Sequence, residues 1–194
     1  MRKDDTNGEY AISALEVRVG SRSVEPPMDS ETFSEFYRRS APALRGYLAR
    51  VSGNVALAED LMQESYLRFL CMPKLEGGEV HYRRYLYRIA TNLLRDHWRR
   101  ATMSSVDDVS ERFLAGEDRL SRVDSQVLLD PAMAQMRPRD RQLLWLAYAE
   151  GYSHREIAEI TGLGATSIRL LLFRARRKIA RLLRQQIAGH GSNA

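Results

Sequence analysis

The sequence contains a single cysteine and no long apolar run. Cys71 alone cannot form an internal disulfide, and it offers no zinc framework, which needs several cysteine or histidine ligands. No uninterrupted apolar stretch approaches the roughly 20 residues of a membrane-spanning helix, and the N-terminus lacks the pattern of a secretory signal. We therefore expect a cytoplasmic protein without membrane insertion.

The sequence also lacks any constellation typical of an active site. Its four histidines are scattered and have no paired acid, nucleophile or metal-ligand spacing around them. No glycine-rich loop is present that would cradle a phosphate. We expect no catalytic residue, no metal ligand, no cofactor and no small-molecule substrate, so the protein is not expected to be an enzyme.

The net charge of +5 is unevenly distributed along the chain. Residues 31–100 carry 12 Arg/Lys against 8 Asp/Glu, and residues 131–194 carry 11 against 4. Between these blocks, residues 101–130 carry only 3 against 7. Two basic blocks with an acidic one between them suggest two polyanion-binding domains and a connector, although unevenly scattered charge in a soluble protein gives the same counts.

The chain divides into two helical segments. No strictly alternating segment predicts a strand, so we expect an all-α protein of two small helical domains joined by a flexible linker. Breaks are expected at Ser52-Gly53-Asn54 and from Pro73 to Glu79. Asp130-Pro131 has the pattern of a helix cap and first turn, and Pro138 is expected to open a helix that runs to Gly151. The expected divisions are a mobile tail 1–28, a first domain 29–101, a flexible or partly helical linker 102–128, a second domain 129–188 and a tail 189–194.

The segment from Tyr82 to Arg99 predicts a helix with one arginine face. At 100° per residue, Arg84, Arg88, Asn92, Arg95 and Arg99 fall within about 80° of one another. Guanidinium groups match phosphate oxygens, and an amide can read a base edge. Tyr85, Tyr87 and Trp98 flank this row, and unpaired bases stack on such rings. A solvated face over ordinary core aromatics would show the same pattern.

A helix-turn-helix is predicted downstream. Ser153 to Glu156 fits a capping box that opens a short helix, and Thr161-Gly162-Leu163 forms the turn. A long helix then begins near Ala165, as in motifs whose second helix lies in the major groove. Its expected buried stripe is Ile168, Leu171, Leu172, Ala175, Ile179 and Leu182. Seven cations cover the rest without an intervening acid: Arg169, Arg174, Arg176, Arg177, Lys178, Arg181 and Arg184.

Two other functions are compatible with such a basic helix. It could lie on anionic lipid, or it could be a spacer with a solvated face. The preceding capping box, short helix and turn favour DNA, because neither alternative requires them.

Three segments of the chain resemble extracytoplasmic-function (ECF) sigma factors, the group 4 class of the sigma-70 family of bacterial RNA polymerase subunits. NVALAEDLMQESYLRF at 54–69 resembles the family's polymerase-binding helix, and YLYRIATNLLRDHWRR at 85–100 resembles its promoter −10 segment. The stretch from Arg137 to Leu183, through RPRDRQLLWLAYAEGYSHREIAEITG and RARRKIARLL, resembles its −35-reading helix-turn-helix. The resemblance covers about 150 residues, in the family's order.

The resemblance implies a promoter-specificity subunit that binds core RNA polymerase and helps to open promoter DNA. Its implied partners are the β′ clamp and β flap, double- and single-stranded promoter DNA, and an anti-sigma factor. The polymerase would be contacted by Glu59, Asp60, Gln63 and Glu64. The −10 element would be contacted by Tyr82, Arg84, Tyr85, Arg88, Asn92, Arg95 and Arg99, with one base flipped under the preceding loop. The −35 element would be contacted by His154, Arg155, Thr166, Ser167, Arg169, Leu170, Phe173, Arg174, Arg176 and Arg177.

Leu170 and Phe173 depart from the family pattern, which usually has polar residues there. They are interpreted in three ways: as contacts to thymine methyl groups, as a docking patch for a protein partner, or as core residues of a rotated helix. The alternative function for the whole chain is a free-standing helix-turn-helix regulator, which would bind duplex DNA without polymerase.

Overall fold

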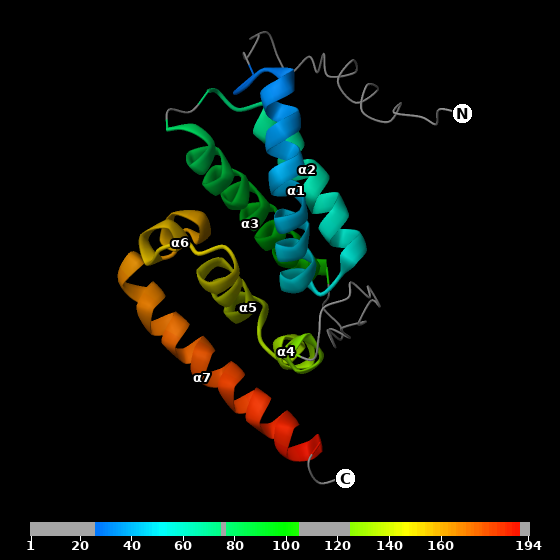
Figure 1. Ribbon diagram of the computed structural model, residues 1–194, viewed down its shortest axis with the longest axis vertical. Coiled ribbons are helices and arrows are strands. Elements are labelled where there is room, and N and C mark those ends of the chain that lie inside the picture. Colours follow the sequence, from blue (N-terminus) through cyan, green and yellow to red (C-terminus); the bar gives the residue numbers. More distant parts are fainter. Residues whose placement is uncertain (1–25, 75–76, 105–124, 191–194) are drawn as a thin grey trace, which may run out of the picture.

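The computed structural model describes residues 26–74, 77–104 and 125–190, and every regular element within them is a helix. In chain order these are α1 (Ser30–Ser52), α2 (Val55–Leu70), α3 (Gly78–Ser104), α4 (Ser125–Ala134), α5 (Pro138–Leu144), the π-helical turn η1 (Trp145–Ala149), α6 (His154–Thr161) and α7 (Ala165–His190) (Figure 1). The expected all-α fold class is confirmed.

Both breaks expected in the first half are present. Gly53 ends α1 with a φ of 73°, and its N–H donates to the Ala49 carbonyl at 2.8 Å. The side chain of Asn54 then accepts the Leu57 amide at 3.0 Å and caps α2. Gly77 has a φ of 108° immediately before α3. Glycine adopts these left-handed conformations without steric cost, so each break lies where the sequence permits it.

Helices α1 to α3 pack around an aromatic cluster. The rings of Phe36 and Phe69 stack with their centroids 5.2 Å apart, and Tyr82 meets Phe69 edge-on at 5.7 Å. Leu86 and Leu94 of α3 are fully buried and belong to the same core cluster. This burial fixes which side of α3 faces inward, and therefore which side remains outside.

One expected helix start in the second half is wrong. Helix α4 begins at Ser125 and contains Pro131, so Asp130 does not cap a helix there. The proline has no N–H and so removes one internal hydrogen bond near the end of α4, and the neighbouring Ala132 and Met133 are buried. The helix that Pro138 was expected to open is present and continues to Ala149, close to the expected end at Gly151. Its last turn is the π-helical η1, where the Glu150 amide donates to the Trp145 carbonyl five residues back, at 3.1 Å.

The two helical groups also pack against each other. Helix α5 lies against α1, and α6 lies against α3 (Figure 1), so one buried cluster continues across both groups. Both ends of the expected linker are helical, because residues 102–104 belong to α3 and residues 125–128 to α4. Residues 105–124 of that linker and residues 1–25 of the expected tail lie outside the described residues.

Among the helices that the structure describes, none combines the length and apolar character needed to cross a membrane. The same residues contain no cluster of three His, Cys, Asp or Glu side chains that could hold a metal ion.

Candidate nucleic-acid interface

The arginine row predicted on Tyr82–Arg99 lies along α3. Arg88, Arg95 and Arg99 are exposed. Asn92 lies half-buried between them, and its Oδ1 accepts a hydrogen bond from the Arg95 guanidinium, which orients the amide within the row. The opposite side of the helix is buried through Leu86, Ala90 and Leu93. The predicted division of this helix into an inner apolar face and an outer basic face is confirmed.

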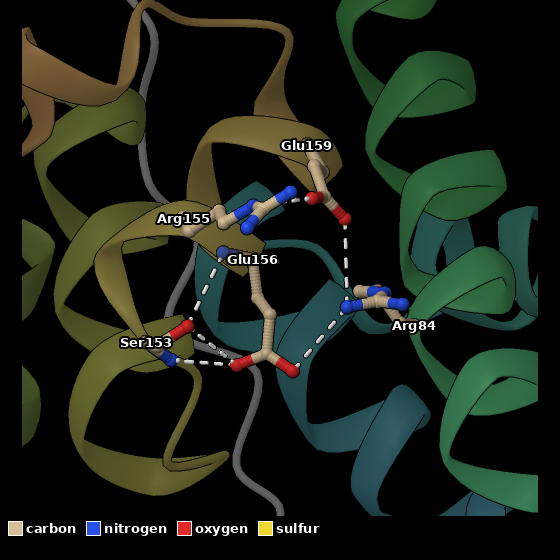
Figure 2. Close-up of polar contacts among 5 residues, drawn as sticks. All are labelled: Arg84, Ser153, Arg155, Glu156 and Glu159. Atoms are coloured by element: carbon tan, nitrogen blue, oxygen red, sulfur yellow. Dashed lines mark hydrogen bonds and ion pairs between the residues drawn. The ribbon is translucent and has the colours of Figure 1, made fainter.

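The N-terminal end of the row is covered by the helix-turn-helix half. Arg84 Nη1 lies 3.4 Å from Glu156 Oε1 and 3.4 Å from Glu159 Oε2, both on α6 (Figure 2). Its side chain is only 23% exposed. The row is therefore divided into an occupied end at Arg84 and an open end from Arg88 onwards.

A second cross-contact lies one residue earlier on α3. Arg83 Nη2 is 2.6 Å from Glu150 Oε2, and the Trp145 indole N–H donates to the other oxygen of Glu150 at 2.9 Å. The Glu150 side chain is only 3% exposed. Because a buried carboxylate is costly unless it is paired and hydrogen-bonded, Glu150 ties α3 firmly to the segment after η1.

The tyrosines around the row are less available than the sequence suggested. Tyr87 is fully buried and packs edge-on against Tyr152 at 5.6 Å, so the expectation that it flanks the row and stacks on bases is wrong. Burial is also the main cause that raises the pKa of the Tyr87 hydroxyl. Tyr82 is buried with its hydroxyl donating to the Pro27 carbonyl at 3.0 Å. Tyr85 and Trp98 are half-buried.

The helix-turn-helix has the local geometry that its sequence predicts. Ser153 Oγ accepts the Glu156 amide at 3.3 Å, and Glu156 Oε2 accepts the Ser153 amide at 2.9 Å, which completes the capping box (Figure 2). Hydrogen bonds from the Ser153 hydroxyl and amide lower the pKa of Glu156. At the other end, Gly162 has a φ of 70° and its amide bonds the Ala158 carbonyl at 2.8 Å. The turn therefore holds α6 and α7 in a fixed relation.

Replacing Ser153 by alanine should lower the free energy of unfolding by about 1 kcal/mol at neutral pH, because α6 loses its cap. A carboxyl with a lowered pKa in the folded state stabilises the fold above its unfolded-state pKa, and this contribution disappears as the pH falls through the folded value. The deficit of the variant should therefore shrink below pH 4. Urea unfolding at several pH values measures it, with Ser34→Ala as the control. A deficit that is independent of pH would contradict the reciprocal box.

Helix α7 exposes its cations and buries its apolar stripe. Ile168, Leu172, Ala175 and Leu182 are buried, and Leu171 and Ile179 are half-buried, as predicted. The exposed cations are Arg169, Arg174, Arg176, Arg177, Arg181 and Arg184, and Lys178 is half-buried. The remaining expected −35 contacts, His154, Arg155, Thr166 and Ser167, are exposed on α6 and on the first turn of α7.

Leu170 and Phe173 are exposed, at 50% and 47%. This exposure excludes the interpretation that α7 is rotated and that both are core residues. The Arg177 guanidinium lies 5.7 Å from the centroid of the Phe173 ring. By helical angle Thr166, Leu170, Phe173 and Arg177 follow one line, which lies opposite the buried stripe. The two apolar side chains therefore occupy the outermost line of the helix.

The expected polymerase-binding residues lie on α2. Asp60 and Gln63 are exposed, whereas Glu59 is paired with Arg45 and Glu64 with Arg68. Leu67 is 46% exposed. Its helical angle places it between Gln63 and Glu64, so this face has an apolar centre that was not predicted. The signal in the sequence was Leu67 itself, which follows Glu64 by three residues and Gln63 by four and therefore shares their side of the helix.

The sequence also missed a buried polar bridge between the two halves. The Gln142 side-chain amide on α5 donates to the Tyr47 hydroxyl at 2.7 Å and to Thr91 Oγ1 at 3.3 Å. Beside it, Arg141 is 1% exposed and donates to the Val51 carbonyl at 2.8 Å. Burial raises the pKa of Tyr47 to about 12, so this hydroxyl remains protonated. Side chains that a helical pattern would place in solvent therefore join α5 to α1 and α3.

Two families match separate parts of the chain: sigma-70 region 2 matches residues 36–103, and sigma-70 region 4 matches residues 126–179. The RNA polymerase sigma factor CarQ of Myxococcus xanthus is 32% identical over 158 residues, which span 79% of this chain and 90% of that protein. The ECF RNA polymerase sigma factor SigL of Mycobacterium tuberculosis is 27% identical over 154 residues, spanning 77% and 87%.

Among solved structures, the sigma factor RpoE of Bartonella quintana, crystallised with the anti-sigma factor NepR, superposes with a TM-score of 0.62 at 21% identity. The match covers 79% of this chain and 98% of that one. At 21% identity, this similarity shows that the two chains share a fold.

Proposed function

This chain belongs to the extracytoplasmic-function class of the sigma-70 family of RNA polymerase subunits, and we propose which of its surfaces performs each step of promoter recognition. A first domain, residues 29–101, binds the polymerase and handles the −10 element. A second domain, residues 129–188, reads the −35 element as duplex. One observation carries this proposal: α7 exposes a row of cations and follows a short, capped α6 across a tight turn. In a helix-turn-helix the second helix enters the major groove, and exposed cations bind the DNA phosphates beside it.

The proposal is tested by adding core polymerase and fragmented genomic DNA to the purified chain and sequencing the transcripts. A defined set of start sites that requires the chain supports it. A free-standing regulator would instead bind duplex by itself and would select no start sites. Transcripts that start at the same places with and without the chain would contradict the proposal.

In the −35 domain, α7 enters the major groove with its outermost line against the base edges. Exposed arginines on either side, such as Arg169 and Arg174, bind backbone phosphates. Leu170 and Phe173 then face base edges, and the apolar group available there is the thymine methyl. We propose that these two residues select thymine at two positions of the −35 element.

Replacing the thymines of the −35 element by uracil should weaken promoter binding, because each substitution removes only a methyl group. A buried methyl group contributes about 0.8 kcal/mol, so each substitution should cost about fourfold. Leu170→Ser/Phe173→Ser should bind thymine and uracil templates equally well, and uracil in the spacer DNA is the control. A different result would identify Leu170 and Phe173 as a docking patch for a protein: the wild type binds thymine and uracil templates equally well, and the double variant no longer binds a protein partner.

In the first domain, the open part of the row on α3 binds the displaced −10 strand. Arg88, Arg95 and Arg99 reach phosphates, and Asn92 contacts the edge of a flipped base held under the loop that precedes α3. Tyr85 supplies a stacking surface beside them. Arg84 belongs to the same surface when α6 does not cover it. Tyr82 is instead buried in the first domain against Phe69, with its hydroxyl on the Pro27 carbonyl, and supports α3 from beneath.

The polymerase is bound through the α2 face made by Glu59, Asp60, Gln63 and Glu64 around Leu67. Its acidic groups complement a basic surface, which orients the encounter, and Leu67 supplies the apolar contact at its centre. The β′ clamp is the proposed partner of this face, and the β flap that of the second domain. An anti-sigma factor is a further proposed partner. The chain performs no chemistry itself, and it works in the cytoplasm, where the polymerase is.

A further inference from the structure

The described residues line a cavity of about 450 Å³ beside the helix-turn-helix. Small organic ligands occupy cavities of about 300–1,000 Å³ in proteins. The walls are almost entirely apolar and include Met133 of α4, Trp145 of η1 and Ile179 of α7. None of the described lining residues belongs to the arginine row of α3 or to the outermost line of α7. The proposed base contacts therefore leave this cavity without a role.

Two apolar side chains of the lining are open to solvent. Tyr148 is 60% exposed and Leu129 is 37% exposed, although both line the cavity. Exposed apolar side chains that gather around a hollow are typical of a binding site, because a ligand that covers them removes apolar surface from water. The cavity can therefore take up an apolar group from solution.

The Trp145 ring forms a wall that is held in place from two sides. Its indole N–H donates to Glu150 at 2.9 Å. Across the ring, Gly46 of α1 approaches so closely that a Cβ there would lie 3.5 Å from Trp145 Cζ2. A wall that is already ordered loses little conformational freedom when a ligand packs against it.

The charge around the cavity has one sign. Among the described residues that line it, Arg50 of α1 and Arg176 of α7 are the only charged ones. Arg176 is exposed, and its helical angle on α7 lies nearer to the buried stripe than that of Arg174 or Arg177. A guanidinium group binds a carboxylate through two parallel hydrogen bonds. An apolar wall with two guanidinium groups complements a molecule that has an apolar body and an anionic head.

Arg50 can exchange its present partner for such a head. It pairs with Asp130, whose side chain is 51% exposed. An exposed ion pair contributes little to stability, so a ligand carboxylate can replace Asp130 at low cost. The Arg50 guanidinium also lies 5.7 Å from the centroid of the Trp145 ring, a cation–π contact that keeps it beside the cavity.

From these observations we propose that the cavity binds a small amphipathic carboxylate. Its alkyl chain lies against the apolar walls, and its carboxylate pairs with the guanidinium groups of Arg50 and Arg176. The lining residues come from positions 50 to 179 of the chain, so no local motif predicts the site. The inference goes beyond promoter recognition and does not depend on how the DNA surfaces are assigned.

The first test measures the binding of sodium decanoate, below the concentration at which it forms micelles. The chain has two tryptophans, so Trp98→Phe leaves Trp145 as the reporter. Its fluorescence should change saturably with decanoate, and calorimetry on the wild type should give the same affinity. Decyltrimethylammonium, which has the same chain length and the opposite charge, should bind at least tenfold more weakly. A change that never saturates, or equal binding of the two amphiphiles, would overturn the inference.

The second test separates the two cations from net charge. In the Trp98→Phe background, Arg50→Gln/Arg176→Gln should weaken decanoate binding at least tenfold. Arg181→Gln/Arg184→Gln removes the same charge from exposed positions of α7 that do not line the cavity, and it should bind as the parent does. Equal weakening in both double variants would mean that decanoate responds only to the overall charge of the chain.

The third test fills the cavity. Ala149 lines it, so Ala149→Phe should reduce decanoate binding at least tenfold by calorimetry. Ala188→Phe adds the same ring at an exposed position of α7 outside the lining and should leave binding unchanged. Circular dichroism establishes that both variants are folded. Undiminished binding to folded Ala149→Phe would place decanoate elsewhere and would overturn the inference.

Other occupants would give different results. Binding to phosphatidylglycerol vesicles that both arginine double variants weaken equally, without binding of monomeric decanoate, would identify a lipid surface contact. A leucine-rich helical peptide that binds the wild type but not Ala149→Phe, while decanoate binds neither, would identify a groove for a protein. Either result would overturn the proposal of a small-molecule site. The sigma assignment is tested separately, by start-site selection with polymerase.

Discussion

Replacing Arg174, Arg176 and Arg177 together by alanine should make promoter binding by the holoenzyme much less sensitive to salt. All three are exposed on α7 with no acidic side chain in that part of the helix. Each cation that neutralises a phosphate contributes about 0.9 to the slope of log K against log salt concentration. The triple variant should therefore lose between two and three units of slope, and its affinity should fall most at low salt. Filter binding from about 50 to 200 mM salt spans the range in which this effect is largest.

The single variants divide this effect among the three residues. A cation that binds backbone lowers the slope by about one unit on any promoter sequence, whereas one that reads a base changes specificity instead. Arg38→Ala removes one exposed cation from α1 and serves as the charge-matched control for each single variant on α7. An unchanged slope in the triple variant would mean that α7 does not lie on the phosphate backbone.

The helix-turn-helix could be predicted from the sequence because its determinants are local. Ser153 and Glu156 cap α6 by bonding each other three residues apart, and Gly162 supplies the left-handed turn. None of these contacts depends on distant parts of the chain. The buried stripe of α7 followed from the helical period, because burial on a long helix repeats with its geometry.

The contact between the halves could not be predicted in this way. Gln142 bonds a tyrosine 95 positions earlier in the chain, and Arg141 bonds a carbonyl 90 positions earlier. On a single helix both residues have the pattern of solvated polar side chains. Their burial depends on how two helical groups dock, and periodicity within one helix carries no information about docking.

Tyr87 shows how the docking of the two halves changes the exposure of a residue at the edge of a helix face. Helical geometry places it between the inner and outer faces of α3, where a ring could pack either way. Tyr152 and Glu150 of the second half cover it, and it becomes one of the largest fully buried side chains among the described residues. The row itself was predictable, whereas the part of it that is accessible in the free chain was not.

Replacing Asn92 by alanine should impair promoter opening more than the formation of the closed complex. Its amide lies in the middle of the open part of the row, where Arg95 holds its oxygen. A good amide contact to a base contributes about 1–3 kcal/mol, and this contact becomes available only when the base leaves the stack. Opening should therefore slow by between fivefold and two orders of magnitude, whereas duplex binding through α7 should change little.

Permanganate footprinting of unpaired thymines, followed beside filter binding on the same promoter, measures the two steps separately. Asp96→Ala is the matched control, because it alters a neighbouring side chain that pairs with Arg99 and carries no base contact in this proposal. A template with a preformed bubble should recover part of the defect, since the polymerase no longer needs the amide to capture the first unpaired base. Equal losses at both steps, with no recovery on the bubble, would place Asn92 among residues that only stabilise the helix.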